Sequence, residues 1–189
     1  MNPFTLTTFY TDEYSGFVEK FKAGATAKDI KFDIHKKPDW IPRRGEVSVS
    51  SHHNNCKWKP HVIEESLQAN ELILWLDIDC TIETINYLPE DFDIGIFTDV
   101  PDHYHNKISV GWIWFRNSKR TFRFLKKWKQ LLKSSKQDHN AFTKAHKGFR
   151  NKLTFKEVTD SVDINWNGNR TDVCKDQNVD SLVERHGFF

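Results

Sequence analysis

Near the middle of the chain, residues 72–76 form an uninterrupted apolar run, Leu-Ile-Leu-Trp-Leu. A strand with one face in water alternates apolar and polar side chains, whereas a strand covered on both faces reads as a continuous apolar run. The run therefore predicts a strand in the centre of a sheet that has other elements packed on both of its faces.

Strand and helix patterns alternate before and after this run. Residues 4–10 and 30–35 have strand patterns, residues 13–24 have apolar side chains at helical spacing and end in glycine, and residues 36–55 are expected to form a loop. Pro60 suits the first turn of a helix that continues to about residue 69. Further strands are expected at 94–98, 108–115, 153–158 and 162–165, and further helices at 119–132 and 138–146. This alternation predicts an α/β fold with a Rossmann-like, mixed and mostly parallel sheet flanked by helices, in a single domain.

Composition limits the classes of function. A chain of 189 residues fits one α/β domain, and its net charge of +2 gives no reason to expect a nucleic acid or a membrane as partner. The sequence has no apolar stretch of about 18 residues, so we expect no transmembrane segment. Three cysteines without metal-ligand spacing and the lack of a visible signal peptide favour a reducing, cytoplasmic location.

Two acidic residues, Asp77 and Asp79, follow the apolar run directly. Parallel sheets bind ligands beyond the carboxyl ends of their strands, and residues i and i+2 of an extended chain point to the same side. Mn²⁺ and Mg²⁺ prefer such carboxylate oxygens and can neutralise a diphosphate leaving group. The pair therefore predicts a divalent metal site, with a solvated loop as the alternative. We interpret a second copy of the motif, Asp91-Phe92-Asp93, as structural.

Four segments resemble a family of retaining glycosyltransferases with the GT-A fold, which includes plant xyloglucan xylosyltransferases and fungal galactosyl- and mannosyltransferases. The first is Trp58-Lys59 followed by a helix and by the segment from Ile73 to Asp79. The others are the segment from Val110 to Ser118 with its following helix, then Gln137-Asp138, and then His186-Gly187-Phe188. They occur in the family's order and span about residues 57–189, although the family's Asp-Gln order is reversed here.

The resemblance implies roles at the donor end of the site. Asp79 is a direct metal ligand, Asp77 contacts ribose or metal, and His186 supplies a third metal ligand. Thr8, Phe9 and Tyr10 bind the nucleobase at the end of the first strand. The alternative is that Phe9 and Tyr10 are residues of the core and its rim. Lys57 and Lys59 lie where a cation reaches the diphosphate, or simply begin a solvated helix.

The resemblance also implies roles near the reacting sugar. Asp138 lies beside the anomeric carbon, where a retaining enzyme needs a nucleophile or an oxocarbenium-stabilising group and an inverting enzyme needs a general base. The alternative for Asp138 is a helix N-cap. Gly111 and Trp112 belong to the strand under the sugar, where glycine permits close approach.

Taken together, the resemblance implies transfer of a sugar from a nucleotide diphosphate sugar, with UDP as the usual carrier, to a glycan acceptor. Residues 1–100 would form the nucleotide-binding half and residues 101–189 the acceptor and catalytic half, and the chain is either a single-domain protein or the first domain of a longer one. Similarity to a viral member of the family further implies capsid glycan synthesis in the host cytosol.

Two other functions fit parts of the sequence. The segment Asp77-Ile78-Asp79-Cys80-Thr81 also matches the nucleophile loop of haloacid-dehalogenase-like, Mg²⁺-dependent phosphatases, with Asp77 as nucleophile. The aromatic residues suit a carbohydrate-binding module. Separately, the helix at 119–132 and the residues after it carry many lysines and arginines, which indicates either a solvated outer face or a surface that docks on a polyanion.

Overall fold

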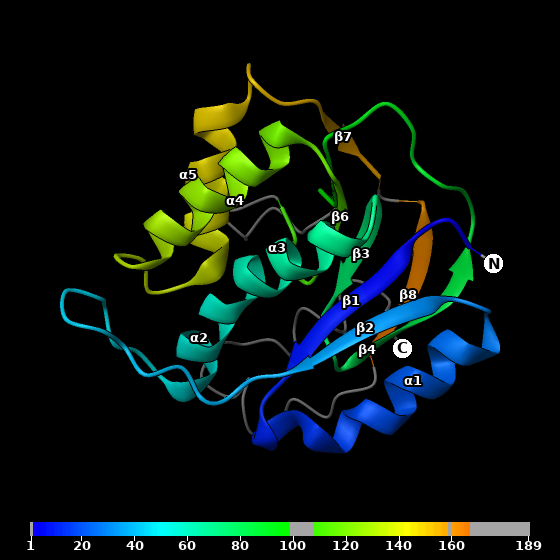
Figure 1. The fold of residues 1–189 in the computed structure, drawn as a ribbon, viewed down its shortest axis with the longest axis horizontal. Helices are drawn as coiled ribbons and strands as arrows, with labels where there is room; N and C mark the ends of the chain where they lie inside the picture. The colour runs from blue at the N-terminus through cyan, green and yellow to red at the C-terminus, as the bar shows by residue number, and fades with distance from the viewer. Residues whose placement is uncertain (1, 99–107, 159, 167–189) are drawn as a thin grey trace.

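A six-stranded sheet forms the centre of the computed structural model, which describes residues 2–98, 108–158 and 160–166 (Figure 1). The strand order is β2-β1-β3-β6-β5-β7. The strands are β1 (Thr5–Tyr10), β2 (Lys31–Lys36), β3 (Leu72–Leu76), β5 (Ile94–Ile96), β6 (Trp112–Arg116) and β7 (Phe155–Glu157). β6 runs antiparallel to β3 and β5, and the remaining neighbours are parallel. The predicted α/β fold with a mixed, mostly parallel sheet is confirmed.

Helices cover both faces of this sheet. One face packs against α3 (Lys59–Ala69), α4 (Lys119–Leu132) and α5 (Asp138–Phe149), which Figure 1 shows gathered on the same side. The other face packs against α1 (Val18–Ala27) and a separate two-stranded sheet made of β4 (Cys80–Ile85) and β8 (Val162–Trp166). The short helix α2 (Ser51–Asn55) and 3₁₀ turns at Asp12–Phe17 and Cys56–Trp58 complete the described elements.

Strand β3 has the position that its sequence predicts. Ile73 and Trp75 belong to the apolar cluster under α3, α4 and α5, whereas Leu72, Leu74 and Leu76 belong to the cluster under α1 and β4. All five side chains are buried. Because apolar layers lie on both sides, no position of the strand tolerates a polar residue at low cost.

Three parts of the chain before β5 differ from the expectation. The predicted helix at 13–24 begins as a 3₁₀ turn, and α1 then continues past Gly24 to Ala27. Gly24 does not end the helix; instead it allows β4 to pack closely, since a Cβ there would lie 3.2 Å from Thr81 Cγ2. The expected loop at 36–55 contains α2. The six-residue strand β4, which follows β3, is an element that the sequence pattern did not indicate.

Strand β6 starts later than predicted. The expected strand at 108–115 is regular only from Trp112, and the four residues before it, 108–111, are not in a strand. This irregular segment lies beside the end of β3, where the Gly111 carbonyl accepts a hydrogen bond from the Asp77 amide at 2.8 Å. Among the residues described, no helix is long and apolar enough to cross a bilayer.

Candidate functional site

The loop after β3 brings Asp77 and Asp79 to the carboxyl edge of the sheet. β1 and β3 are parallel neighbours, so their carboxyl ends lie at the same edge. Two backbone hydrogen bonds fix Asp77. Its amide donates to the Gly111 carbonyl, and its carbonyl accepts from the Cys80 amide at 3.0 Å. The Asp79 side chain is buried, and the Cys80 thiol lies 3.8 Å from its Oδ1.

A buried lysine links this loop to a distant helix. The Lys59 ammonium lies 3.0 Å from Asp77 Oδ1 and 3.0 Å from Asp138 Oδ2, and it also reaches the Val110 carbonyl at 3.4 Å. Lys59 comes from the start of α3, Asp77 from the end of β3 and Asp138 from the start of α5. We refer to Lys59, Asp77 and Asp138 as the charged triad.

The charges of the triad stabilise one another. Burial by itself would lower the pKa of Lys59, but the Asp138 and Asp77 carboxylates outweigh it and raise that pKa above its ordinary value. Burial would likewise raise the pKa of Asp138, but Lys59 and then His139 hold it well below the usual range. Both Lys59 and Asp138 are therefore charged at neutral pH although each is almost fully buried.

Asp138 is the first residue of α5, and Gln137 occupies the cap position without a side-chain hydrogen bond. The Asp138 carboxylate instead accepts from the His139 amide at 2.9 Å and lies 3.1 Å from His139 Nδ1. The N-cap alternative therefore does not account for this carboxylate. Asp138 also lies close enough to His53 to oppose, through its charge, the lowering of the His53 pKa by burial. Neither histidine was assigned to this site from the sequence. His139 directly follows Asp138 in the chain, whereas the proximity of His53 depends on how α2 and α5 pack.

The two lysines proposed for the diphosphate have different surroundings. The Lys57 ammonium donates to the Val47 carbonyl at 2.7 Å and lies 3.9 Å from Glu46 Oε2. Lys59, two residues later, is the cation that contacts Asp77. Their side chains therefore reach different parts of the molecule, and a diphosphate-binding role for Lys57 stays a prediction.

The end of β1 lies next to the triad's edge of the sheet. Thr8 is buried, Phe9 packs 5.9 Å between ring centroids from Trp75, and Tyr10 packs on the opposite, α1 side. The hydroxyl oxygens of Thr8 and Thr11 are buried without a hydrogen-bond partner among the described residues. Buried hydroxyls in that state favour a polar ligand at this edge. Thr11 was not among the residues singled out from the sequence.

Gly111 and Trp112 also lie at this edge. A Cβ at Gly111 would be 3.5 Å from Asp77 Oδ2, so the glycine borders the triad directly. Trp112 is buried, with its ring centroid 4.3 Å from that of Phe97. The predicted metal ligand His186 lies outside the described residues.

The chemistry of the loop suits a divalent metal at Asp79 better than at Asp77. Both oxygens of Asp77 already face cationic or N–H donors, since Lys59 lies 3.3 Å from Oδ2 and Trp75 Nε1 donates to Oδ1 at 3.2 Å. Within the described ranges, no group of three or more histidine, cysteine or acidic side chains converges as a metal site. A metal bound here would need further ligands beyond the two aspartates.

The second Asp-x-Asp copy has a structural role. Asp93 accepts hydrogen bonds from the Ser118 hydroxyl at 2.8 Å and from the Thr154 amide at 2.9 Å. It thereby connects the start of α4 to the segment before β7. These contacts agree with the interpretation of this copy as structural.

The fold is shared with solved glycosyltransferases. The structure of a glycosyltransferase involved in the glycosylation of the major capsid of PBCV-1 matches with a TM-score of 0.57 and 12% identity over 82% of this chain and 81% of that one. The apo form of the glycosyltransferase GlyE from Streptococcus pneumoniae TIGR4 matches with a TM-score of 0.51 and 9% identity, over 82% of this chain and 45% of the other. The chain has a glycosyltransferase-like fold.

A third structure with this fold is that of A197 from STIV, with a TM-score of 0.51 and 11% identity over 86% of this chain and 84% of that one. No family model matches the sequence, and no curated protein matches it. The resemblance to glycosyltransferases read from the sequence is therefore confirmed for the fold. The comparisons give no support to a phosphatase.

Proposed function

We propose that this chain is a metal-dependent glycosyltransferase that moves a sugar from a nucleotide diphosphate sugar, most simply a UDP-sugar, to a glycan acceptor. The observation that carries the proposal is the charged triad. It joins the acidic loop after β3 to Asp138 on α5, at the sheet edge where folds of this class bind ligands.

Asp138 is the carboxylate that we place beside the anomeric carbon of the sugar being transferred. Lys59 and His139 hold its pKa well below the usual range, so its carboxylate is ionised and is a weak base. An inverting enzyme would need a base with a pKa near the working pH, whereas a retaining one needs negative charge beside an oxocarbenium-like centre. The low pKa therefore supports retention of configuration. Lys59 is a positioning residue, because it acts by fixing Asp138 and Asp77.

Mn²⁺ or Mg²⁺ is the proposed cofactor. Asp79 would bind it, with Asp77 and His186 as the other proposed ligands, and the ion would offset the charge of the departing diphosphate. Thr8, Phe9 and Tyr10 are the proposed contacts of the nucleobase, and Gly111 and Trp112 those of the sugar. The buried, unpartnered hydroxyl of Thr8 supports a polar ligand at that end.

The fold shared with the PBCV-1 enzyme supports a narrower hypothesis for the acceptor. We propose that it is a glycan of a viral capsid protein and that the reaction takes place in the host cytosol.

Isothermal titration calorimetry with UDP-glucose tests the donor site. We expect binding in the presence of Mn²⁺, loss of binding with EDTA, and at least about tenfold weaker binding for Asp79→Asn, because removal of a charged metal ligand costs more than about 1.4 kcal/mol. Failure of UDP- and GDP-sugars to bind under any metal condition would reject the transferase proposal.

The second Asp-x-Asp copy offers a matched control. Asp91→Asn removes the same charge from an exposed residue whose backbone φ of 53° asparagine also tolerates, so its binding should equal that of the wild type. Hydrolysis of an aryl phosphate with Mg²⁺ is the test of the phosphatase alternative. Strong turnover that disappears in Asp77→Asn would favour that alternative.

A further inference from the structure

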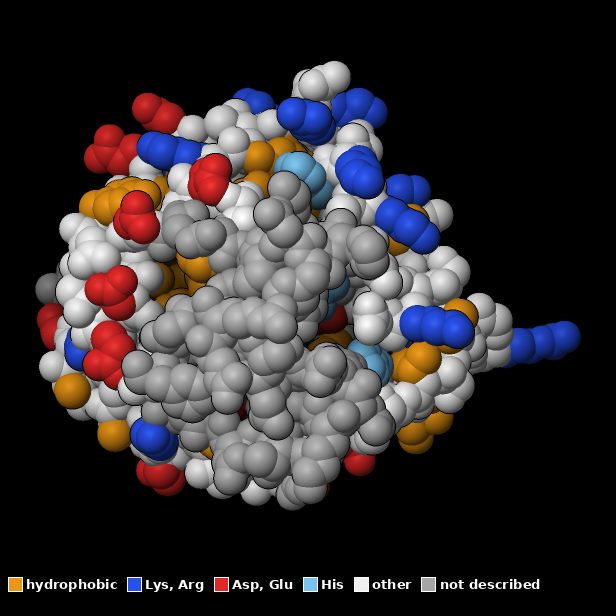
Figure 2. Space-filling model, turned by 180° about the vertical axis from the view of Figure 1, so that it is seen from behind, with side chains coloured by type: hydrophobic (Ala, Val, Ile, Leu, Met, Phe, Trp, Pro, Cys, Tyr) orange, Lys and Arg blue, Asp and Glu red, His pale blue; other side chains and the backbone are white. Residues whose placement is uncertain are grey.

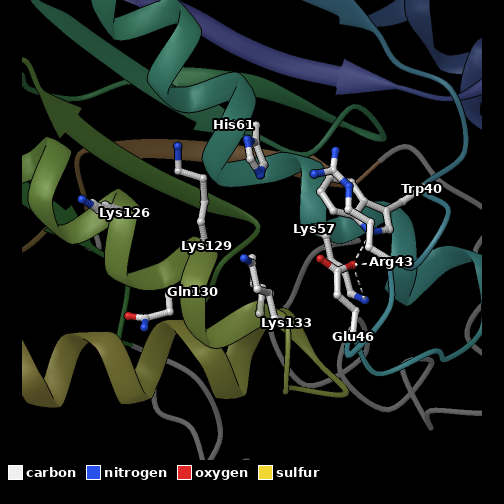
Figure 3. A pocket seen from close by; sticks show the side chains of 10 residues that line it. Trp40, Arg43, Glu46, Lys57, His61, Lys126, Lys129, Gln130 and Lys133 are labelled. Atoms are coloured by element: carbon white, nitrogen blue, oxygen red, sulfur yellow. Dashed lines mark hydrogen bonds and ion pairs between the residues drawn. The ribbon is translucent and has the colours of Figure 1, made fainter.

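A hollow lined by none of the triad residues lies between the Cys56–Trp58 turn with the start of α3, the C-terminal part of α4 with the residue after it, and the segment that precedes α2. It has a volume of about 480 Å³, which is within the size range of small-molecule sites. Figure 3 shows side chains from these three parts of the chain around one space. They are Trp40, Arg43, Glu46, Lys57, His61, Lys126, Lys129, Gln130, Leu132 and Lys133. We call this space the basic cavity.

The basic cavity has a large excess of positive charge. Arg43, Lys57, Lys126, Lys129 and Lys133 are five cations, and Glu46 is the one carboxylate among the lining residues. The whole chain, by contrast, has a net charge of only +2. Figure 2 shows lysine and arginine side chains concentrated on the side of the molecule formed by α4, α5 and the segment before α2. The cavity thus concentrates charge that the chain as a whole does not carry.

Part of this charge is balanced within the protein. Glu46 accepts from Trp40 Nε1 at 3.1 Å and from the Arg43 amide at 3.3 Å, and Lys57 lies 3.9 Å away. Burial alone would raise the pKa of Glu46, but these hydrogen bonds and the nearby cations lower it, so this carboxylate is ionised. Lys129 pairs with Glu64. Lys126 and Lys133 make no ion pair with any described residue and are exposed, so they remain available to an anion.

Aromatic and polar groups complete the lining. The Trp40 indole is fixed by its hydrogen bond to Glu46 and lies edge-on to Trp58, with ring centroids 4.7 Å apart. His61 lies 5.6 Å from Trp40 between ring centroids. Burial and then the charge of Lys129 lower the pKa of His61, so its ring is neutral at pH 7 and offers both a hydrogen-bond donor and an acceptor.

This lining fits a particular kind of ligand. A free phosphate needs only a few cations, whereas a cavity of this size with a rigid indole and a neutral imidazole also accommodates a ring beside the charge. Sugar rings pack against indole faces, and lysines bind phosphate and carboxylate groups. None of the triad residues lines the cavity. Lys57 lines it and donates to the Val47 carbonyl, whereas the Lys59 side chain reaches Asp77 instead.

We propose that the basic cavity binds an anionic sugar, that is, a saccharide unit carrying a phosphate or a carboxylate. On the proposed transferase function this unit belongs to the acceptor glycan, and the cavity is a recognition site for it apart from the donor site. The cavity's own binding does not depend on that function and can be measured on the chain alone.

Calorimetric titrations with glucose 6-phosphate, glucuronate, inorganic phosphate and glucose test the proposal. We expect both anionic sugars to bind at least about tenfold more tightly than inorganic phosphate, and glucose not to bind measurably, because charge and ring contacts are both needed. Equal affinity for inorganic phosphate and glucose 6-phosphate would show that the cavity holds any anion, and absence of binding would equally overturn the proposal.

A pair of variants separates the cavity from general surface charge. Lys126→Gln with Lys133→Gln removes two exposed cations from the lining, and we expect about tenfold weaker binding of glucose 6-phosphate. Lys119→Gln with Lys136→Gln removes two exposed cations that do not line the cavity, and we expect affinity within about twofold of the wild type. Equal weakening in both pairs would mean that the ligand senses only the basic surface of α4, as a polyanion or an anionic membrane would.

Two further measurements locate the ligand. A bound anion should raise the pKa of His61. NMR titration measures this pKa, and the His61→Gln variant assigns the signal. An unchanged His61 pKa would place the ligand elsewhere. Asp79→Asn should keep its affinity for glucose 6-phosphate. Nucleotide binding that fails while glucose 6-phosphate still binds would therefore reject the transferase proposal without rejecting this one.

Discussion

At the scale of single residues, the charged triad is the least expected part of the molecule. A buried lysine is costly unless carboxylates accompany it, and Lys59 has two at 3.0 Å. Neither carboxylate is near it in the sequence, since Asp77 is 18 residues away and Asp138 is on α5. The three side chains therefore depend on one another for stability as well as for any chemistry.

Replacement of Lys59 should reveal this dependence. Lys59→Met keeps much of the side-chain volume but removes the cation that faces the buried Asp138 carboxylate and the partly buried Asp77 carboxylate, and we expect it to lower the free energy of unfolding by about 3–5 kcal/mol. Urea denaturation measures the change. Adding Asp138→Asn to the Lys59→Met variant removes one of the unpaired charges and should recover part of the loss.

An exposed ion pair provides the comparison. Lys22→Met breaks the pair with Glu19 on the surface of α1, and we expect a change below about 0.5 kcal/mol. Similar losses for Lys22→Met and Lys59→Met would contradict the importance that we give to the triad.

At the scale of elements, close packing of strands explains features that periodicity alone leaves open. In β5, Gly95 is paired with Trp114 of β6, and β5 also pairs with β7 on its other side. A Cβ on Gly95 would lie 2.9 Å from Trp114 Cβ and 3.1 Å from Val158 Cγ1. Trp114 is fully buried, so it has little room to move away. The glycine is required by the tryptophan beside it.

Gly95→Ala should therefore destabilise the fold. Overpacking beside a fixed tryptophan is expected to lower the free energy of unfolding by about 1–3 kcal/mol, measured by urea denaturation. The matched change Gly148→Ala lies on an open side of α5, with no atom within 4 Å of the new Cβ, and should leave stability unchanged or raise it by up to about 1 kcal/mol. A neutral Gly95→Ala would show that β5 and β6 can separate at little cost.

At the scale of the whole molecule, the sheet brings together groups that are far apart in the chain. The end of β1, the loop after β3, Gly111 before β6 and Asp138 on α5 meet at one edge of the sheet. The helices α3, α4 and α5 cover one face of the sheet, and α3 and α4 enclose the basic cavity with the segment before α2. A ligand held by several of these elements would stabilise all of them at once.

Thermal unfolding tests this coupling. A ligand that binds only the folded chain stabilises it by about 2.7 kcal/mol at one hundred times its Kd, which for a domain of this size raises the unfolding midpoint by about 5–10 °C. We expect such a shift from UDP with Mn²⁺, its loss on adding EDTA, and none in Asp79→Asn. An equal shift without metal would contradict the assignment of Asp79.

The sequence by itself determined the class of fold and the position of the acidic loop. An apolar run such as Leu72–Leu76 has few ways to be buried, and helical periodicity gave the bounds of α4 without error. These are local properties, because burial on both faces and the spacing of apolar side chains are written in consecutive residues. The strand β4 lacked such a signal, since its partner β8 lies about 80 residues further on.

Only the tertiary structure decided which charged groups act together. From the sequence, Lys57 and Lys59 were equivalent candidates at the start of a helix, and Asp138 was equally suited to a cap. The packing of α3 and α5 on the sheet directs Lys59 to Asp77 and Asp138, and directs Lys57 to Val47 and the basic cavity. A helix turns by about 100° per residue, so two positions separate side chains by more than half a turn, and only the neighbouring elements determine what each side chain meets.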